Sequence, residues 1–181
     1  MVQISSKTKS QTLKKARTES VRVLGIDPGF GRMGFGVIEE TRGDLRVIDY
    51  GCLETQKTET IAQRLLELKK FIDQLVCDAR PVVVAVESLF FSKNVKTALA
   101  VGEARGVILF ALAEHGLPVF ELSPQEVKLA VTGYGNAEKG QVQRMVQKIL
   151  GLAKIPKPDD AADALALAIA AAQMRRFLNK L

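Results

Sequence analysis

Val21-Arg22-Val23-Leu24-Gly25-Ile26-Asp27-Pro28-Gly29 is an apolar run that ends in an acid and a turn pair. The run predicts a strand over residues 21–27, and the Pro-Gly pair is typical of a turn. Two further strand-like runs follow, Phe35-Gly36-Val37-Ile38 and residues 45–53, with Arg42-Gly43-Asp44 as a hairpin turn between them. Three antiparallel strands in succession are therefore the economical interpretation.

The rest of the chain alternates helical and strand patterns. Apolar residues at helical spacing, with Thr60 and Gln63 as a capping box, predict a helix over 60–77. Ser123-Pro124-Gln125-Glu126 carries the start signals of a short helix: a Ser N-cap, a Pro and then a Glu. The other expected elements are strands at 82–87 and 118–122 and helices at about 94–115, 138–150 and 159–178. These patterns predict an α/β fold, a mixed five-stranded sheet with helices on both faces.

Composition and length describe one ordinary globular domain. The chain has 181 residues, of which 47% are hydrophobic and 25% charged. Its most apolar segment, residues 161–172, is shorter than a bilayer requires, so we expect no membrane span. Cys52 and Cys77 lack metal-ligand or redox spacing, and no signal-peptide pattern precedes the first strand. We therefore expect a reducing, cytoplasmic compartment.

The positive charge is concentrated at the N-terminus. Residues 1–20 carry five basic side chains against Glu19, whereas residues 21–181 hold 21 basic and 19 acidic groups. Residues 1–20 are polar and aperiodic, which predicts a disordered basic tail ahead of a domain at 21–181. The tail is open to several interpretations: a solvated tail, a nucleic-acid-binding arm, a targeting peptide or a cloning remnant.

Four acids stand where an ordinary structural role explains them poorly: Asp27, Glu87, Asp160 and Asp163. Asp27 and Glu87 end apolar runs, and an ionised carboxylate there is costly unless a cation meets it. Capping of a helix N-terminus explains an acid at position 160 but not Asp163, which has no basic neighbour on its own helix. A divalent metal with oxygen ligands would satisfy all four acids, and bound metal would leave the rest of the domain basic.

Gly29-Phe30-Gly31-Arg32-Met33-Gly34 matches the G-x-G-x-x-G pattern of dinucleotide-binding proteins. That motif must open a helix, whereas a strand follows here, so the dinucleotide interpretation fails. We expect instead a glycine-rich hairpin that lets another backbone approach Asp27 closely.

Carboxylates that hold two adjacent metals suit phosphodiester hydrolysis. The only histidine, His115, lies beside Gly116 at the end of a predicted helix, where a structural role is expected.

Five segments, GIDPGFGRMGFGVI, VVVAVESLFFSKN, ALAVGEARGVI, SPQEVKLAVTGYGNAEKGQV and DDAADALALAIA, resemble in order and spacing the RuvC family of Holliday junction resolvases. The similarity covers about residues 21–175. It implies a ribonuclease-H-like fold and a homodimer that makes paired symmetric nicks in four-way DNA junctions during homologous recombination and DNA repair. It also implies two Mg²⁺ ions per active site, for which Mn²⁺ substitutes, and a branch-migration partner of the RuvA-RuvB type.

The resemblance also assigns residues. The family's catalytic and metal-binding quartet falls on the four acids above, its two important lysines on Lys128 and Lys139, and its junction-probing aromatic on Phe90. Lys93 follows Phe90 in a polar, basic stretch, where an aromatic can stack on an unpaired base while lysines hold phosphates. We therefore expect Phe90, Lys93, Lys128 and Lys139 to contact DNA.

Two other classes of protein are alternatives. An actin-like ATPase also has a first strand that ends in an Asp-x-Gly turn, but it normally needs about twice this length. A catalytically inactive DNA-binding module would have little reason to keep four buried acids. The helix over 94–115 is the expected dimer interface, on the apolar residues Leu99, Val101, Ala104, Ile108, Leu109, Ala111 and Leu112.

Overall fold

The computed structural model describes residues 20–88 and 95–178, with only the backbone for 95–97. The predicted tail up to residue 19, Phe90 and Lys93 lie outside these residues. The elements in chain order are β1 (Val21–Asp27), β2 (Arg32–Thr41), β3 (Asp44–Glu54), α1 (Ile61–Ala79), β4 (Val83–Glu87), α2 (Val95–Glu114), β5 (Val119–Leu122), α3 (Pro124–Thr132), α4 (Lys139–Ile149) and α5 (Asp159–Leu178).

Local start and turn signals are confirmed. Thr60 caps α1 and Ser123 caps α3, each in a reciprocal capping box. The hairpin between β2 and β3 places Arg42 and Gly43 at positive φ (54° and 98°), as a two-residue turn of this kind requires. The predicted glycine-rich turn is shorter than expected, because β2 already begins at Arg32, where it pairs with the end of β3.

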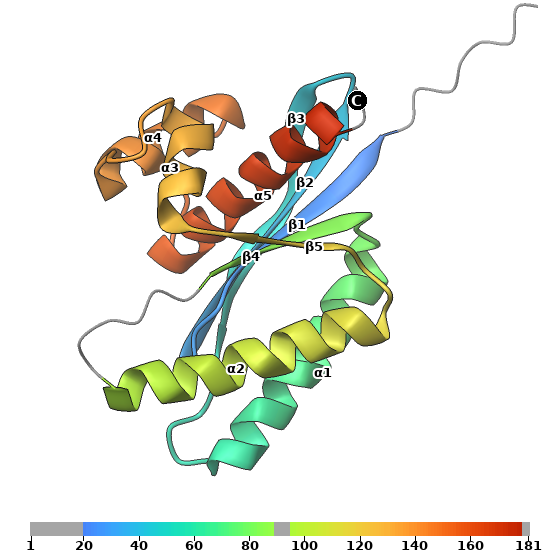
Figure 1. Ribbon diagram of the computed structural model, residues 1–181, viewed down its shortest axis with the longest axis vertical. Coiled ribbons are helices and arrows are strands. Elements are labelled where there is room, and N and C mark those ends of the chain that lie inside the picture. Colours follow the sequence, from blue (N-terminus) through green and yellow to red (C-terminus); the bar gives the residue numbers. More distant parts are fainter. Residues whose placement is uncertain (1–19, 89–94, 179–181) are drawn as a thin grey trace, which may run out of the picture.

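The sheet has the strand order β3-β2-β1-β4-β5 (Figure 1). The first three strands pair antiparallel, whereas β4 lies parallel to β1 and β5 parallel to β4. Convergence of the four acids requires β1 and β4 to be neighbours, and the sheet order fulfils that requirement. The prediction of a mixed five-stranded sheet is confirmed.

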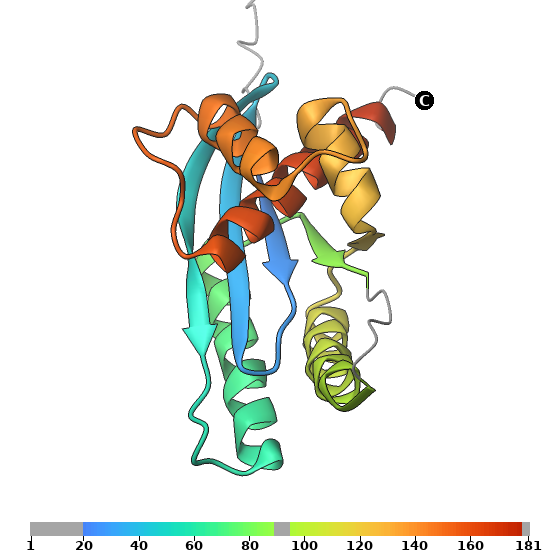
Figure 2. The same cartoon turned by 90° about the vertical axis from the view of Figure 1, so that its left-hand side faces the viewer.

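Helices cover both faces of this sheet. α1 and α2 pack on one face, and α3, α4 and α5 lie on the other (Figures 1 and 2). Alternate residues of β1 divide between the two cores: Val23 faces α5, whereas Leu24 and Ile26 face α1 and α2. Within the described ranges, no helix is both long and apolar enough to cross a bilayer.

Two glycines bring α5 onto the sheet. A Cβ on Gly25 of β1 would overlap the main-chain oxygen of Ala164, and a Cβ on Gly34 of β2 would overlap that of Asp160. Because only glycine leaves this space, the helix backbone can lie directly against the strands. This close approach next to Asp27, which pairs with Gly34 across the hairpin, is the role expected of the glycine-rich segment.

The interface expected on α2 needs correction. Four of its seven apolar residues are fully buried in the protein's own core: Ala104, Ile108, Ala111 and Leu112. Among the described side chains of α2, the large apolar ones that are exposed are Leu99 (66%) and Phe110 (60%). Between them Gly106 is also exposed, and a Cβ there would meet nothing within 4 Å. Among the described side chains of α2, an apolar partner surface is therefore a narrow stripe through these three residues, and the exposed Glu103 lies on the same side of the helix.

Candidate active site

Asp27 and Glu87 end neighbouring strands on the same face of the sheet. The register pairs Ile26 of β1 with Val86 of β4, and each acid is the next residue of its strand. Val23 of β1 and Val83 of β4 both face α5, and the period of two places Asp27 and Glu87 on that face as well. Both acids are partly buried at the carboxyl ends of their strands.

Asp160 and Asp163 join them from the first turns of α5. They lie three residues apart, on one side of the helix. Asp160 lies over Gly34, the cross-strand partner of Asp27. The structure therefore brings the four predicted acids to one edge of the sheet.

The closeness of these acids shifts the pKa of Asp27. Burial raises its pKa to about 8, and the negative charges of Glu87, Asp163 and Asp160 add to that rise. Burial also raises the pKa of Glu87, with a further contribution from Asp163, while a hydrogen bond from Asp27 opposes the rise. A carboxyl group that retains its proton near neutral pH, surrounded by other acids, is a place where a cation is favoured.

Two lysines line the hollow beside these acids. A cavity of about 270 Å³ is bounded by Glu87, Lys128, Lys139 and Asp163, with apolar residues of α3, α4 and α5 behind them. Lys139, the first residue of α4, places its Nζ 2.9 Å from Oδ2 of Asp163 and 3.7 Å from Oδ2 of Asp159. The lysines predicted to bind DNA therefore lie next to the predicted acids.

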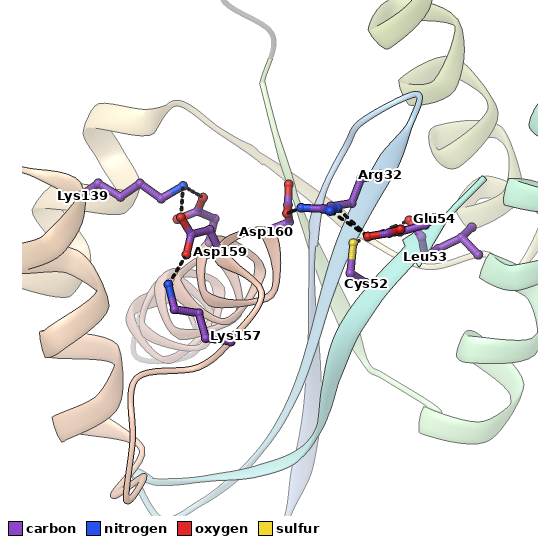
Figure 3. Close-up of polar contacts among 9 residues, drawn as sticks. Arg32, Cys52, Leu53, Glu54, Lys139, Lys157, Asp159 and Asp160 are labelled. Carbon is purple, nitrogen blue, oxygen red and sulfur yellow. Dashed lines mark hydrogen bonds and ion pairs between the residues drawn. The ribbon is translucent and has the colours of Figure 1, made fainter. Parts of the chain in front are cut away.

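A second ion-pair group lies on the other side of the start of α5 (Figure 3). Arg32, the first residue of β2, places its Nη1 3.2 Å from Oδ2 of Asp160 and its Nη2 2.7 Å from Oε1 of Glu54. In Figure 3 its guanidinium lies between the two carboxylates. Burial and the charge of Asp160 raise the pKa of the nearby Cys52 thiol to about 11, so this thiol is not a nucleophile at neutral pH.

Two of the four acids have basic partners that the sequence did not indicate. Asp160 pairs with Arg32 and Asp163 with Lys139, partners that come from distant parts of the sequence. Among the residues that the structure describes, no three acidic, His or Cys side chains are arranged to hold a metal ion. The donor set nevertheless fits a hard divalent cation, because it consists of carboxylate oxygens and a bound cation would relieve the repulsion that raises the pKa of Asp27.

Three basic side chains at the site were not predicted from the sequence. Arg32 holds Asp160, and Arg105 of α2 donates from Nε to the main-chain oxygen of Glu87 (3.3 Å). Arg64 of α1 fixes the loop after Asp27: it donates to the Phe30 carbonyl (3.2 Å) and stacks over the Phe30 ring (3.9 Å). The sequence did offer one signal for Arg32 and Arg105, because each is a basic residue inside a segment that resembles the family. His115, 3.1 Å from Asp73 between α1 and α2, lines no part of this hollow.

The sheet order, with acids at the ends of the neighbouring strands β1 and β4 and on the last helix, is that of a nuclease of the ribonuclease-H-like class. The family described as crossover junction endodeoxyribonuclease RuvC matches residues 23–171. The chain belongs to the RuvC family. This membership favours neither of the alternatives, the actin-like ATPase and the inactive DNA-binding module.

Individual relatives agree with that assignment. The crossover junction endodeoxyribonuclease RuvC of a Roseiflexus species is 52% identical over 162 residues, which is 87% of this chain and 96% of the relative. The structure of T. thermophilus RuvC in complex with a Holliday junction substrate superposes with a TM-score of 0.82 at 36% identity, over 87% of this chain and 96% of that one. A yeast mitochondrial Holliday junction resolvase, at 17% identity and a TM-score of 0.61 over 88% of this chain and 84% of that one, shares the fold.

Proposed function

We propose that this protein hydrolyses phosphodiester bonds at four-way DNA junctions with two Mg²⁺ ions, or Mn²⁺ in their place. The observation that carries the proposal is the cluster of acids at the ends of β1 and β4 and at the start of α5, beside two lysines, in which burial and the neighbouring charges raise the pKa of Asp27 to about 8. Such a cluster repels a bare phosphate, so it needs cations before it can act on DNA. The family supplies the substrate class, since its T. thermophilus member is described in complex with a Holliday junction.

The proposed roles of the residues follow from their positions. Asp27, Glu87, Asp160 and Asp163 would hold the ions, and bound Mg²⁺ would supply an activated water and stabilise the leaving oxygen. Lys139, at the N-terminus of α4, and Lys128 on α3 face the same hollow and would bind the phosphates that flank the scissile bond. Phe90 and Lys93 would contact unpaired bases and phosphates from the segment that follows β4.

We further propose a two-fold dimer, because resolution of a junction requires two symmetric nicks and the described residues of each chain form one acid cluster. The exposed stripe of Leu99, Gly106 and Phe110 on α2 is the proposed contact. A branch-migration complex of the RuvA-RuvB type and a cytoplasmic setting complete the proposal, and both rest on the family.

The assignment of the acids is testable by charge removal. Asp27→Asn, Glu87→Gln, Asp160→Asn and Asp163→Asn should each abolish nicking of a junction in Mg²⁺ and leave junction binding in EDTA at least as tight as in the wild type. Because Asp27 keeps its proton near neutral pH without metal, Asp27→Asn should leave binding unchanged, whereas loss of a negative charge near the DNA backbone should tighten it in the other three variants. Asp78→Asn, at an exposed position of α1 that contacts Gln74, is the matched control and should change neither property. Near-normal nicking by one of the four variants would remove that residue from the site.

A further inference from the structure

Arg32 is a basic residue that the proposed chemistry does not use, although it contacts one of the proposed metal ligands. Its guanidinium contacts two carboxylates, with Nη1 3.2 Å from Asp160 Oδ2 and Nε 3.0 Å from Glu54 Oε1. A planar fork of this kind can hold two acids in fixed positions.

The fold holds the two contacts of Arg32 differently. Arg32 and Glu54 are cross-strand partners in the β2–β3 register, so the sheet holds them together. Asp160 comes from the first turn of α5, 128 positions further along the chain, through a single contact. The Asp160 contact can therefore break while Arg32 stays on Glu54.

The Asp160 oxygens are needed elsewhere for a metal to bind. Among the described residues no three potential ligands are arranged to hold an ion, and one of the four acids is engaged by Arg32. A divalent cation and the guanidinium are competitors for the same carboxylate. Binding of one must weaken binding of the other.

We infer that Arg32 is a positioning residue: a built-in counter-ion that holds Asp160 until a metal ion displaces it. The inference rests on the proposed function, because it takes Asp160 as a metal ligand. When Asp160 turns to the metal, the guanidinium stays on Glu54 at the rim of the site, where its half-exposed head is free to meet a DNA phosphate.

Metal affinity without DNA tests the inference directly. Mn²⁺ is titrated into the full chain and its Kd is measured by calorimetry and by the electron paramagnetic resonance signal of free Mn²⁺. Arg32→Gln should lower the Kd about two- to fivefold, the range that one exposed ion pair provides. Arg32→Lys keeps the positive charge and should stay closer to the wild type. Arg46→Gln, which removes an arginine that pairs with Glu39 elsewhere on the sheet, should leave the Kd unchanged.

A double-mutant cycle separates competition for Asp160 from a general effect of charge. In an Asp160→Asn background the Arg32→Gln effect on the Kd should disappear. An unchanged or higher Kd in Arg32→Gln would overturn the inference. So would an Arg32→Gln change that lowered the Kd in the Asp160→Asn background by the same factor as in the wild type. If the wild type bound no Mn²⁺, the proposed function and the inference would both fail. If the wild type bound Mn²⁺ and Arg32→Gln did not lower the Kd, only the inference would fail.

Discussion

Replacement of Asp27 by Asn should stabilise the metal-free protein while it abolishes the activity. Burial and the neighbouring acids raise the pKa of Asp27 from 3.8 to about 8. Between these values the folded state retains a proton that the unfolded state has lost, so this group makes the protein less stable as the pH rises through that window. The loss is complete above about pH 8 and absent below about pH 4.

The size of the effect follows from the same shift. Between pH 3.8 and pH 7 the raised pKa of Asp27 lowers the free energy of unfolding by roughly 4 kcal/mol, at about 1.36 kcal/mol per pH unit. Because the Asn amide is itself a partly buried polar group, we expect Asp27→Asn to recover about 2–4 kcal/mol at pH 7. For a chain of this size that raises the Tm by roughly 4–16 °C.

The assay is thermal unfolding followed by circular dichroism, in EDTA, from pH 4 to pH 9. The variant should gain over the wild type as the pH rises, and the two should converge near pH 4. Addition of Mg²⁺ should stabilise the wild type and not the variant, because a ligand stabilises the state that binds it. An Asp27→Asn protein that is less stable than the wild type at pH 8 in EDTA would refute the electrostatic argument.

Three further changes test other parts of the account. Lys139→Gln removes the cation beside Asp163 and should slow cleavage about 10²-fold with little change in the Tm, as single-turnover kinetics would measure. Gly34→Ala places a Cβ against the α5 backbone and should cost about 1–3 kcal/mol in urea unfolding, whereas Gly106→Ala, in open space, should be neutral or stabilising. Phe110→Glu puts a charge on the exposed stripe of α2 and should convert a dimer to a monomer in sedimentation equilibrium. The reasoning would be contradicted by an unchanged cleavage rate in Lys139→Gln, by an unchanged free energy of unfolding in Gly34→Ala, or by a Phe110→Glu protein that is still a dimer.

Local patterns in the sequence predicted the fold closely. The caps at Thr60 and Ser123 are decided within four residues, so the starts of α1 and α3 could be identified without tertiary information. The acids at the ends of β1 and β4 were conspicuous because a buried carboxylate is costly wherever the strands lie. The neighbouring positions of β1 and β4 were required by function and had no local signal.

Ion pairs and buried faces could not be predicted in the same way. Arg32 and Asp160 lie 128 positions apart, and their contact depends on the docking of α5 over Gly34. On α2 apolar residues occur on nearly every side, so periodicity could not separate the buried Ile108 from the exposed Phe110. The Arg32–Asp160 ion pair and the burial of one face of α2 both depend on tertiary packing.

The most direct test of the central claim is cleavage of an immobile four-way junction compared with a linear duplex of the same sequence, each in Mg²⁺ and in EDTA. The account predicts two symmetric, ligatable nicks in the junction in Mg²⁺, none in EDTA, none in the duplex, and none with Asp27→Asn. Nicking that persists in EDTA, or an Asp27→Asn protein that cuts the junction at the wild-type rate, would contradict it.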